Sequence, residues 1–206
     1  YKIIILDSNI NSSSFVIDKL KKLGIKENYD FEEKINFYKG DIRDKSLIRK
    51  IFEDAKNNKQ VIKSVIHFAG LKSVAESVIN PILYWDNNFI GSLNLISVME
   101  EYKCRSIVFS SSATIYGKNN GELLNENHVL LPSNPYGETK LSIEKLLSNL
   151  FISSKKEWRI ANLRYFNPIG AHPSGMIGEN PFQIPNNLFP YICKVAAGKL
   201  NKLNIF

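Results

Sequence analysis

The stretch SIVFSSSATIYG, residues 106–117, is the part of the sequence that best predicts the fold. It begins with a short run around Ile107, Val108 and Phe109, side chains typical of strands, and the run ends in hydroxyl residues. Stretches of helical period precede and follow it, at residues 81–102 and 136–150. A buried strand between two helices is typical of a parallel sheet with crossover helices.

The same alternation continues in both directions along the chain. Further strands are predicted at residues 2–6, 35–39, 64–68 and 160–165, and further helices at residues 13–23 and 46–57, the second capped by Asp44. The strand runs are apolar on both faces, as expected for strands covered by helices on both sides. The sequence therefore predicts an α/β protein with a doubly wound, Rossmann-type parallel sheet. Within residues 81–102, helical spacing assigns Phe89, Leu93, Ile96 and Met99 to the core or to a helix-pairing face.

After residue 165 the character of the sequence changes. Residues 167–190 are rich in Pro, Gly and Asn and predict a long irregular segment, followed by a helix that begins near Asn187. The chain starts at Tyr1 inside an apolar run and stops at Phe206 in the opening of another strand. We therefore expect an incomplete dinucleotide-binding domain at residues 1–166 and the start of a substrate-binding region at residues 167–206.

Composition narrows the class of protein. The 206 residues carry a net charge of +7, but the lysines are scattered and form no basic stripe with aromatic residues, which disfavours nucleic-acid binding. No apolar run approaches the roughly 20 residues that span a bilayer, so we expect no membrane segment. Cys104 and Cys193 are far apart and no histidines have metal-ligand spacing, so no disulfide or metal site is predicted and a cytoplasmic location is favoured.

Two acidic residues follow predicted strands. Asp7 closes the first strand, where a carboxylate could accept hydrogen bonds from the ribose hydroxyls of a dinucleotide and repel a 2′-phosphate. Asp41 follows the second strand and could accept from an adenine amino group. Each is equally compatible with a turn or helix-capping role.

Small residues follow the third predicted strand. Ala69 and Gly70 would let the backbone approach a pyrophosphate closely, although a tight turn explains them as well. His67, just before them, is expected to be a packed core histidine and not a base. His128 and His172 fall in loops, where we expect a solvated and a structural side chain.

Tyr136 and Lys140 form the clearest chemical motif. Four residues apart, they would project from one face of a helix, so the ammonium would favour the ionised phenol. This charge and that of a bound oxidised nicotinamide ring would together move the phenol pKa from about 10 toward neutral pH. A phenolate formed in this way could act as a general base. The spacing alone also fits a surface tyrosine beside a solvated lysine. Ser112 at the strand end and Pro135 before the helix favour the catalytic interpretation.

Several segments together resemble one known family. They are FAGLK (68–72), DNN (86–88), SSSATIYG (110–117), PYGETK (135–140), LRYFNPIGAHPSG (163–175) and IPNNL (184–188). They resemble the UDP-glucose 4-epimerases, also called UDP-galactose 4-epimerases, of the extended short-chain dehydrogenase/reductase family. The segment at 163–175 is the most specific, because relatives with other chemistry keep the Tyr-x-x-x-Lys spacing but not that segment.

The resemblance implies NAD as cofactor, a UDP-hexose as substrate and a role for each matching position. The adenosine ribose would contact Asp7, Ser8, Asn11 and Ser12, and the adenine would contact Asp41 and Ile42. The pyrophosphate and nicotinamide side would contact Phe68, Ala69, Gly70, Lys72, Asn87 and Phe166. The catalytic residues would be Ser112, Tyr136 and Lys140, and the UDP-sugar would also contact Lys72, Asn167, Asn187 and Leu188.

The implied reaction is reversible epimerisation at C4 of UDP-glucose and UDP-galactose, a step of galactose metabolism, through a 4-keto sugar. Tyr136 would take the proton of the 4-hydroxyl, Ser112 would hydrogen-bond the same oxygen, and Lys140 would bind the nicotinamide ribose. The resemblance also implies a homodimer formed through the helices at residues 81–102 and 136–150.

The chain departs from the family pattern at both ends. It lacks the family's first strand, which precedes residues 2–6, and the Gly-rich phosphate loop that follows that strand. It also lacks most of the smaller substrate domain, where the residue that separates hexoses from N-acetylhexosamines would lie. The missing strand is central in the family's sheet, so its loss is expected to leave a gap in the hydrogen-bonded ladder. We expect this chain alone to be inactive.

Three other functions are compatible with the fold. Nucleotide-sugar 4,6-dehydratases need an extra acid and base after the Ser-rich strand end, where this chain has Ala113 and Thr114. UDP-uronic acid epimerases and decarboxylases also tolerate a Ser-rich strand end. A non-catalytic dinucleotide-binding relative would usually have lost the tyrosine or the lysine, and both are present here.

Overall fold

The computed structural model describes residues 1–26, 34–118, 121, 123–178 and 187–204. The chain divides into two compact units, one made of Tyr1–Lys39 with Asn167–Phe206 and the other of Gly40–Phe166. The predicted functional boundary near residue 166 stays a prediction. No helix in the described ranges is long and apolar enough to cross a membrane.

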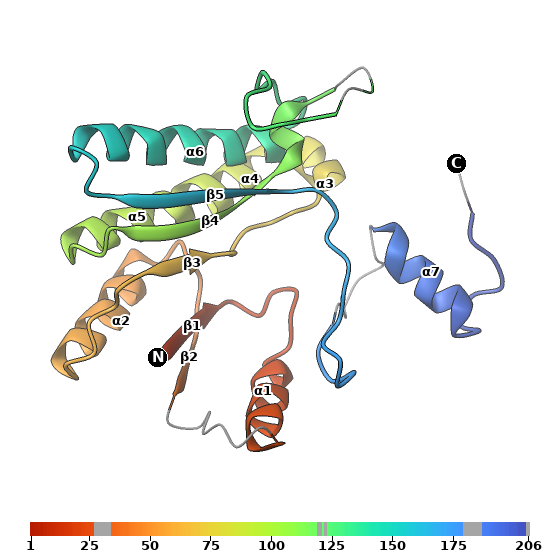
Figure 1. The fold of residues 1–206 in the computed structure, drawn as a ribbon, viewed down its shortest axis with the longest axis horizontal. Helices are drawn as coiled ribbons and strands as arrows, with labels where there is room; N and C mark the ends of the chain where they lie inside the picture. The colour runs from red at the N-terminus through yellow and green to blue at the C-terminus, as the bar shows by residue number, and fades with distance from the viewer. Residues whose placement is uncertain (27–33, 119–120, 122, 179–186, 205–206) are drawn as a thin grey trace. The chain divides into compact units, whose positions relative to one another are not determined.

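The larger unit, residues 40–166, is built on a parallel sheet. Its strands are β3 (Val65–His67), β4 (Ser106–Ser112) and β5 (Arg159–Tyr165), in the order β3-β4-β5 (Figure 1). The register pairs His67 with Phe109 and Ser112 with Tyr165. The carboxyl ends of the strands therefore meet at one edge of the sheet, where ligands of α/β proteins usually bind.

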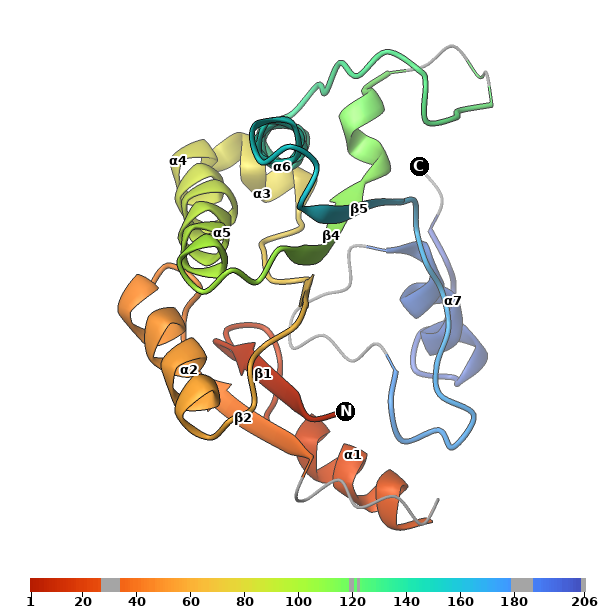
Figure 2. The same ribbon diagram turned by 60° about the vertical axis from the view of Figure 1, so that its left-hand side comes forward.

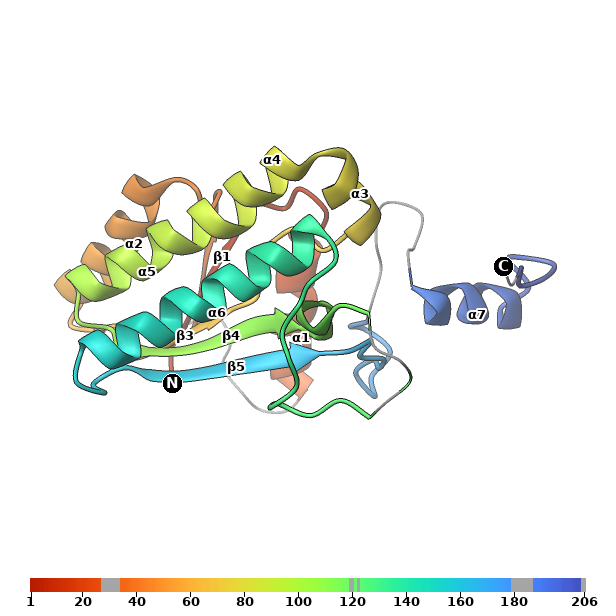
Figure 3. The ribbon, with the colours of Figure 1, turned by 90° about the horizontal axis from the view of Figure 1, so that it is seen from above.

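Helices lie on one face of this sheet. They are α2 (Lys45–Asn57), α3 (Val74–Ile79), α4 (Pro81–Tyr84), the π-helical segment η1 (Trp85–Ile90), α5 (Gly91–Glu101) and α6 (Pro135–Ser153), with a short 3₁₀ helix η2 (Ala113–Tyr116) after β4. Figure 2 shows α5 and α6 on the same side of the sheet, and Figure 3 shows that α4 and α5 follow each other along one line, with α6 beside them. As predicted, Asp44 caps α2 by accepting from the backbone N–H of Leu47 at 3.0 Å.

Burial differs between the two faces of the sheet. Ile107 and Phe109 of β4 are at most 1% exposed, because they pack beneath the helices. Ile66 of β3 is 65% exposed and Leu163 of β5 is 38% exposed. The expectation of strands covered on both faces is therefore wrong for β3 and β5, because no described element of this unit covers their second face.

The helix predicted at residues 81–102 contains the π-helical segment η1. A π-turn holds one residue more than an α-turn, so it shifts the side chains that follow around the helix axis. Ile96 and Met99 are buried as predicted, whereas Leu93 is 37% exposed. The buried face at the junction instead carries Asn88 and Ser92.

The smaller unit has its own parallel pair of strands. β1 (Ile3–Asp7) pairs with β2 (Ile35–Lys39), α1 (Phe15–Lys26) lies between them in sequence, and α7 (Leu188–Ala196) follows the irregular residues 167–178. The strands in the described ranges form two separate sheets, β1-β2 and β3-β4-β5, which agrees with the predicted gap in the ladder. Residues 184–186 of the family-like IPNNL segment and the strand predicted at Phe206 lie outside the described residues.

Gly117 fixes the end of η2, and replacing it with Ala is expected to destabilise the protein by about 2–4 kcal/mol. Its φ of 70° and ψ of −146° suit glycine alone, and a Cβ there would lie 1.9 Å from the backbone oxygen of Leu131. Gly121→Ala is the matched control, because Gly121 also has a positive φ but nothing within 4 Å of a Cβ. Equal losses in chemical denaturation of the two variants would contradict the close packing at Gly117.

Candidate active site

Ser112 ends β4 at the carboxyl edge of the sheet. It is 8% exposed, and its Oγ accepts hydrogen bonds from the backbone N–H of Thr114 at 3.2 Å and from Thr114 Oγ1 at 3.0 Å. These bonds cap η2 and hold the hydroxyl in place. Ser112 is also close enough to the phenol of Tyr136 to have a lowering effect on its pKa.

Tyr136 and Lys140 lie one turn apart near the start of α6, as predicted. Pro135 occupies the first turn and Asn134 caps the helix by accepting from the backbone N–H of Gly137 at 2.9 Å. Tyr136 is 8% exposed and Lys140 is 4% exposed. The alternative of a surface tyrosine beside a solvated lysine is therefore excluded.

Lys140 is held by both polar and aromatic groups. Its Nζ donates to the backbone oxygen of Ser110 at 2.7 Å, and it lies 4.9 Å from the ring centre of Phe109 and 5.8 Å from that of Tyr136. Burial lowers the pKa of Lys140 to about 8. The ring of Phe109 favours the ammonium form, because its π-face attracts a cation.

The protein groups around Tyr136 do not lower its pKa by themselves. Burial raises the pKa of Tyr136 above its ordinary value, and Ser112 opposes that shift. The sequence indicated the neighbouring lysine but not the depth of burial, which has the larger effect. The residues of this unit therefore favour the neutral phenol, and a further positive charge is needed to make Tyr136 a base at neutral pH.

Lys140→Met is expected to raise the free energy of unfolding at pH 7 by about 2–3 kcal/mol, because it removes a buried charge. Unfolded lysine keeps its proton up to about pH 10.4, whereas folded Lys140 loses it near pH 8, so the unfolded state binds more protons between these values. The loss of folding stability caused by the buried charge of Lys140 therefore becomes smaller as pH rises through that window. Urea denaturation at pH 7, 8.5 and 10 should show the difference from the parent shrinking. The exposed Lys145→Met on α6 is the control, and a difference that does not change with pH would contradict this interpretation.

The turn after β3 approaches the lysine closely. Gly70 has a φ of 154°, and a Cβ there would lie 3.1 Å from Asn88 Oδ1 and 3.7 Å from Lys140 Nζ. Leu71 donates its backbone N–H to Asn88 Oδ1 at 2.7 Å, and Asn88 Nδ2 donates to the Leu71 oxygen at 3.0 Å. A larger residue at position 70 would therefore crowd the side chains of Asn88 and Lys140. The predicted contact residue Phe68 is 62% exposed at the start of this turn.

The other predicted residues within residues 40–166 lie on η1, in the loop before α2 or directly after β5. Asn87 is on η1, next to the buried Asn88. Asp41 and Ile42 follow β2 and contact η1 and α5 through Arg43 and Gly91. Phe166 follows β5 and is 67% exposed, beside a cavity of about 470 Å³ that Tyr116, Arg164 and Tyr165 also line.

The remaining predicted residues belong to the smaller unit. Asp7 Oδ1 accepts from the backbone N–H of Asn9 at 2.7 Å and from Ser12 Oγ at 3.2 Å, so Asp7 and Ser12 are together. Ser8 and Asn11 lie in the same turn. Asn187 and Leu188 begin α7, and Asn167 follows β5.

The histidines have the roles expected of them, with one difference. His67 is 3% exposed and its Nε2 lies 2.8 Å from Ser92 Oγ, and burial lowers its pKa to about 3. It is therefore a neutral core histidine. His172 Nδ1 lies 2.8 Å from Ser174 Oγ in its loop. His128 is not fully solvated, because it is half-buried and its Nδ1 accepts from the backbone N–H of Asn125 at 3.0 Å.

Sequence reasoning missed three groups that shape this site. Asn88 clamps the turn at Leu71, Arg43 binds Asp41, and Arg164 pairs with Glu144. Spacing of four residues from Tyr84 and Ser92 could have placed Asn88 on the buried helix face. Within the described ranges no group of three or more His, Cys, Asp or Glu could hold a metal ion.

The parallel sheet, the serine at the end of β4 and the buried Tyr136 and Lys140 on the next helix define a Rossmann-type domain of the extended short-chain dehydrogenase/reductase class. The chain belongs to the family described as GDP-mannose 4,6 dehydratase, whose model matches residues 1–206. The predicted fold class and family resemblance are thereby confirmed.

Named relatives of this chain include UDP-glucose 4-epimerases. It is 46% identical over 206 residues to that of Cyamopsis tetragonoloba and 45% identical to that of Bacillus subtilis (strain 168). The match covers 100% of this chain but 56% and 57% of those relatives, so the chain spans little more than half of their length. The crystal structure of the Bifidobacterium longum UDP-glucose 4-epimerase with NAD⁺ and UDP matches with a TM-score of 0.85 at 41% identity, covering 98% of this chain and 57% of that one.

Proposed function

We propose that this chain is the cofactor-binding part of a longer UDP-glucose 4-epimerase, an isomerase that interconverts UDP-glucose and UDP-galactose in galactose metabolism. The buried arrangement of Ser112, Tyr136 and Lys140 carries the proposal, because burial of all three side chains at a ligand-binding edge is expected of a catalytic group. The named relatives with 45–46% identity support this particular reaction.

The residues present fit NAD as the cofactor. Ala69 and Gly70 carry little or no side chain close to Lys140 Nζ, so a nicotinamide ribose and pyrophosphate could approach their backbone, and Phe68, Lys72, Asn87 and Phe166 would complete that side. Asp41 with Ile42 would hold the adenine, and Asp7, Ser8, Asn11 and Ser12 its ribose. Bound oxidised NAD would supply hydride exchange at C4 of the sugar and the further positive charge that favours the Tyr136 phenolate.

The chain's own residues would move the proton. Tyr136 would remove the proton of the sugar 4-hydroxyl while Ser112 hydrogen-bonds the same oxygen, and Tyr136 would return the proton after the hydrogen at C4 has changed face. Lys140 would donate to the nicotinamide ribose and favour the phenolate through its charge. Asn167, Asn187 and Leu188 would contact the UDP-sugar.

We also propose that the whole protein is a cytoplasmic homodimer. The helix at residues 81–102 exposes apolar side chains, among them Ile82 at 83% and Ile90 at 42%, and α6 exposes Ile152 at 69% just after residue 150. Such surfaces are typical of an interface. A dimer mass for the full-length protein and a monomer mass for the Ile82→Lys/Ile90→Lys variant would support the interface, and an unchanged dimer would contradict it.

A 4,6-dehydratase is the second candidate, because the family description names that reaction. Elimination of water across C5 and C6 needs an acid and a base close to the Tyr136 hydroxyl. The two positions after Ser112, Ala113 and Thr114 of η2, offer neither. A UDP-uronic acid epimerase or decarboxylase and a non-catalytic dinucleotide-binding relative would also share the fold.

The test is an assay of the full-length protein with UDP-galactose, UDP-glucuronate and GDP-mannose in separate reactions. Conversion of UDP-galactose to UDP-glucose is expected, with no 4-keto-6-deoxy product from GDP-mannose. Residues 1–206 alone are expected to be inactive. Turnover of GDP-mannose or UDP-glucuronate alone would contradict the epimerase proposal, and inertness toward all three would favour a non-catalytic protein.

A further inference from the structure

The loop at residues 40–43 is fastened to η1 and α5 by several independent contacts. Arg43 Nη1 donates to Asp86 Oδ2 of η1 at 2.6 Å, and Asn94 Nδ2 of α5 donates to the Arg43 backbone oxygen at 2.9 Å. Ile42 is 8% exposed and packs on Gly91, and a Cβ at Gly91 would lie 2.5 Å from Cγ2 of Ile42. The backbone of this loop is therefore held in one position beside η1.

Arg43 also binds the side chain of Asp41. Its Nε donates to Asp41 Oδ1 at 3.0 Å and its Nη2 to Oδ2 at 2.7 Å, which is the paired geometry of a guanidinium on a carboxylate. The backbone N–H of Arg43 donates to Oδ1 at 2.8 Å. Three donors therefore fix the plane of the Asp41 carboxylate.

This arrangement leaves Asp41 as an oriented hydrogen-bond acceptor. A carboxylate has about four lone-pair positions, and Arg43 occupies three of them. The bonds from Arg43 keep the pKa of Asp41 below its ordinary value, against the opposing effect of burial, so the carboxylate stays ionised at neutral pH. An ionised acceptor with one free position suits an amino group and repels a carbonyl oxygen.

We propose that Arg43, anchored by Asp86, is a positioning residue that aims the Asp41 carboxylate at the 6-amino group of a purine and so makes the cofactor site selective for adenine. The inference rests on the proposed function, because it concerns the adenine end of the same NAD site. Asp86 directly precedes Asn87, which is assigned to the cofactor, so η1 supports both contacts.

The test compares NAD with nicotinamide hypoxanthine dinucleotide, in which a carbonyl replaces the purine 6-amino group. Affinities are measured by calorimetry on full-length protein freed of bound nucleotide. The parent is expected to prefer NAD by about ten-fold or more, and Arg43→Met to lose about ten-fold in NAD affinity while its affinity for the hypoxanthine dinucleotide changes less than about two-fold. Arg43→Lys, which keeps the charge but not the fork, and Asp86→Asn are expected to lose part of the preference.

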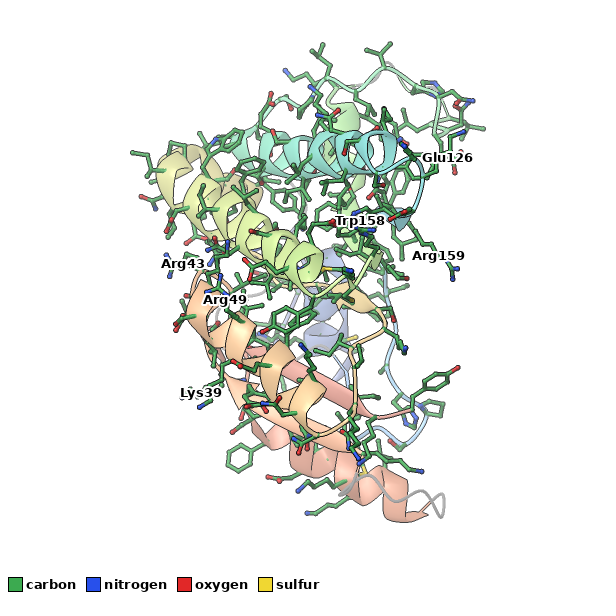
Figure 4. All side chains as sticks on the ribbon, turned by 90° about the vertical axis from the view of Figure 1, so that its left-hand side faces the viewer. Lys39, Arg43, Arg49, Glu126, Trp158 and Arg159 are labelled. Atoms are coloured by element: carbon green, nitrogen blue, oxygen red, sulfur yellow. The ribbon has the colours of Figure 1, made fainter. Side chains whose placement is uncertain are left out.

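Arg49→Met is the matched control. Arg49 of α2, which is labelled with Arg43 in Figure 4, binds Glu101 of α5 through Nε at 2.8 Å and Nη2 at 3.0 Å. It makes the same kind of ion pair between neighbouring elements, with Glu101 and not Asp41 as its partner. Its removal is expected to leave both affinities unchanged. Equal losses for the two dinucleotides in Arg43→Met, or no preference in the parent, would overturn the inference. A parent that binds neither dinucleotide would overturn the proposed function together with it.

Discussion

Tyr136→Phe in the full-length protein is expected to lower the interconversion of UDP-galactose and UDP-glucose by about 10²- to 10⁴-fold, with NAD still bound. The substitution removes only the phenolic oxygen, which is the proposed base. The ring is 8% exposed and packs edge to face on Tyr84 at 6.4 Å between centres, so phenylalanine keeps the packing. Rates are measured with both sugars, and bound NAD is quantified after denaturation.

Tyr102→Phe is the control for Tyr136→Phe. Tyr102 packs its ring on Phe52 at 5.4 Å between centres and lies outside the site. Its variant is expected to keep the parent rate. A Tyr136→Phe turnover within ten-fold of the parent turnover would remove Tyr136 from the mechanism. Loss of bound NAD in Tyr136→Phe would show that the substitution acts through the cofactor site.

Arg164→Met is expected to lower the free energy of unfolding by about 3–5 kcal/mol. Arg164 of β5 donates to Glu144 of α6 through Nη2 at 2.8 Å and Nε at 3.2 Å, and its Nη1 donates to Tyr116 Oη at 2.9 Å and to the backbone oxygen of Glu126 at 3.0 Å. The Glu144 side chain is 6% exposed and that of Arg164 is 19% exposed. Removing the arginine leaves a buried carboxylate without its cation and removes the hydrogen bond from β5 to the backbone oxygen of Glu126.

Urea denaturation measures the Arg164→Met effect, and two further variants interpret it. Arg159→Met on the same strand is the control, because Arg159 is exposed at the surface (Figure 4), and it is expected to change stability by less than about 0.5 kcal/mol. The double variant Arg164→Met/Glu144→Leu should recover much of the loss, since it removes the unpaired charge as well. Similar losses for Arg164→Met and Arg159→Met would contradict the buried ion pair.

The regular elements of the fold could be predicted because their signals are local. The run at residues 35–39 is the strand β2 as predicted, and the bounds of β4 and α6 differ from prediction by a few residues at most. Helix α3 was missed because Val74–Ile79 is too short to establish a helical period. The π-turn of η1 was missed because apolar spacing does not record one additional residue in a helix.

The positions of Ser112, Tyr136 and Lys140 could also be predicted, but their electrostatics could not. Spacing on a helix brings Tyr136 and Lys140 to one face, whereas the direction of the Tyr136 pKa depends on burial, which involves residues distant in sequence. The same limit applies to Arg43 and Asp86, which are 43 positions apart. Contacts of this kind depend on how elements distant in sequence pack together, which local spacing does not record.

The most direct measurement follows the hydrogen at C4. Full-length protein is incubated in ordinary water with UDP-galactose carrying deuterium at C4, and the UDP-glucose formed is analysed by NMR. Because the hydrogen removed from C4 is returned to the same carbon without exchange with solvent, the account predicts UDP-glucose with deuterium retained at C4. UDP-glucose with solvent hydrogen at C4, or no UDP-glucose at all, would contradict it.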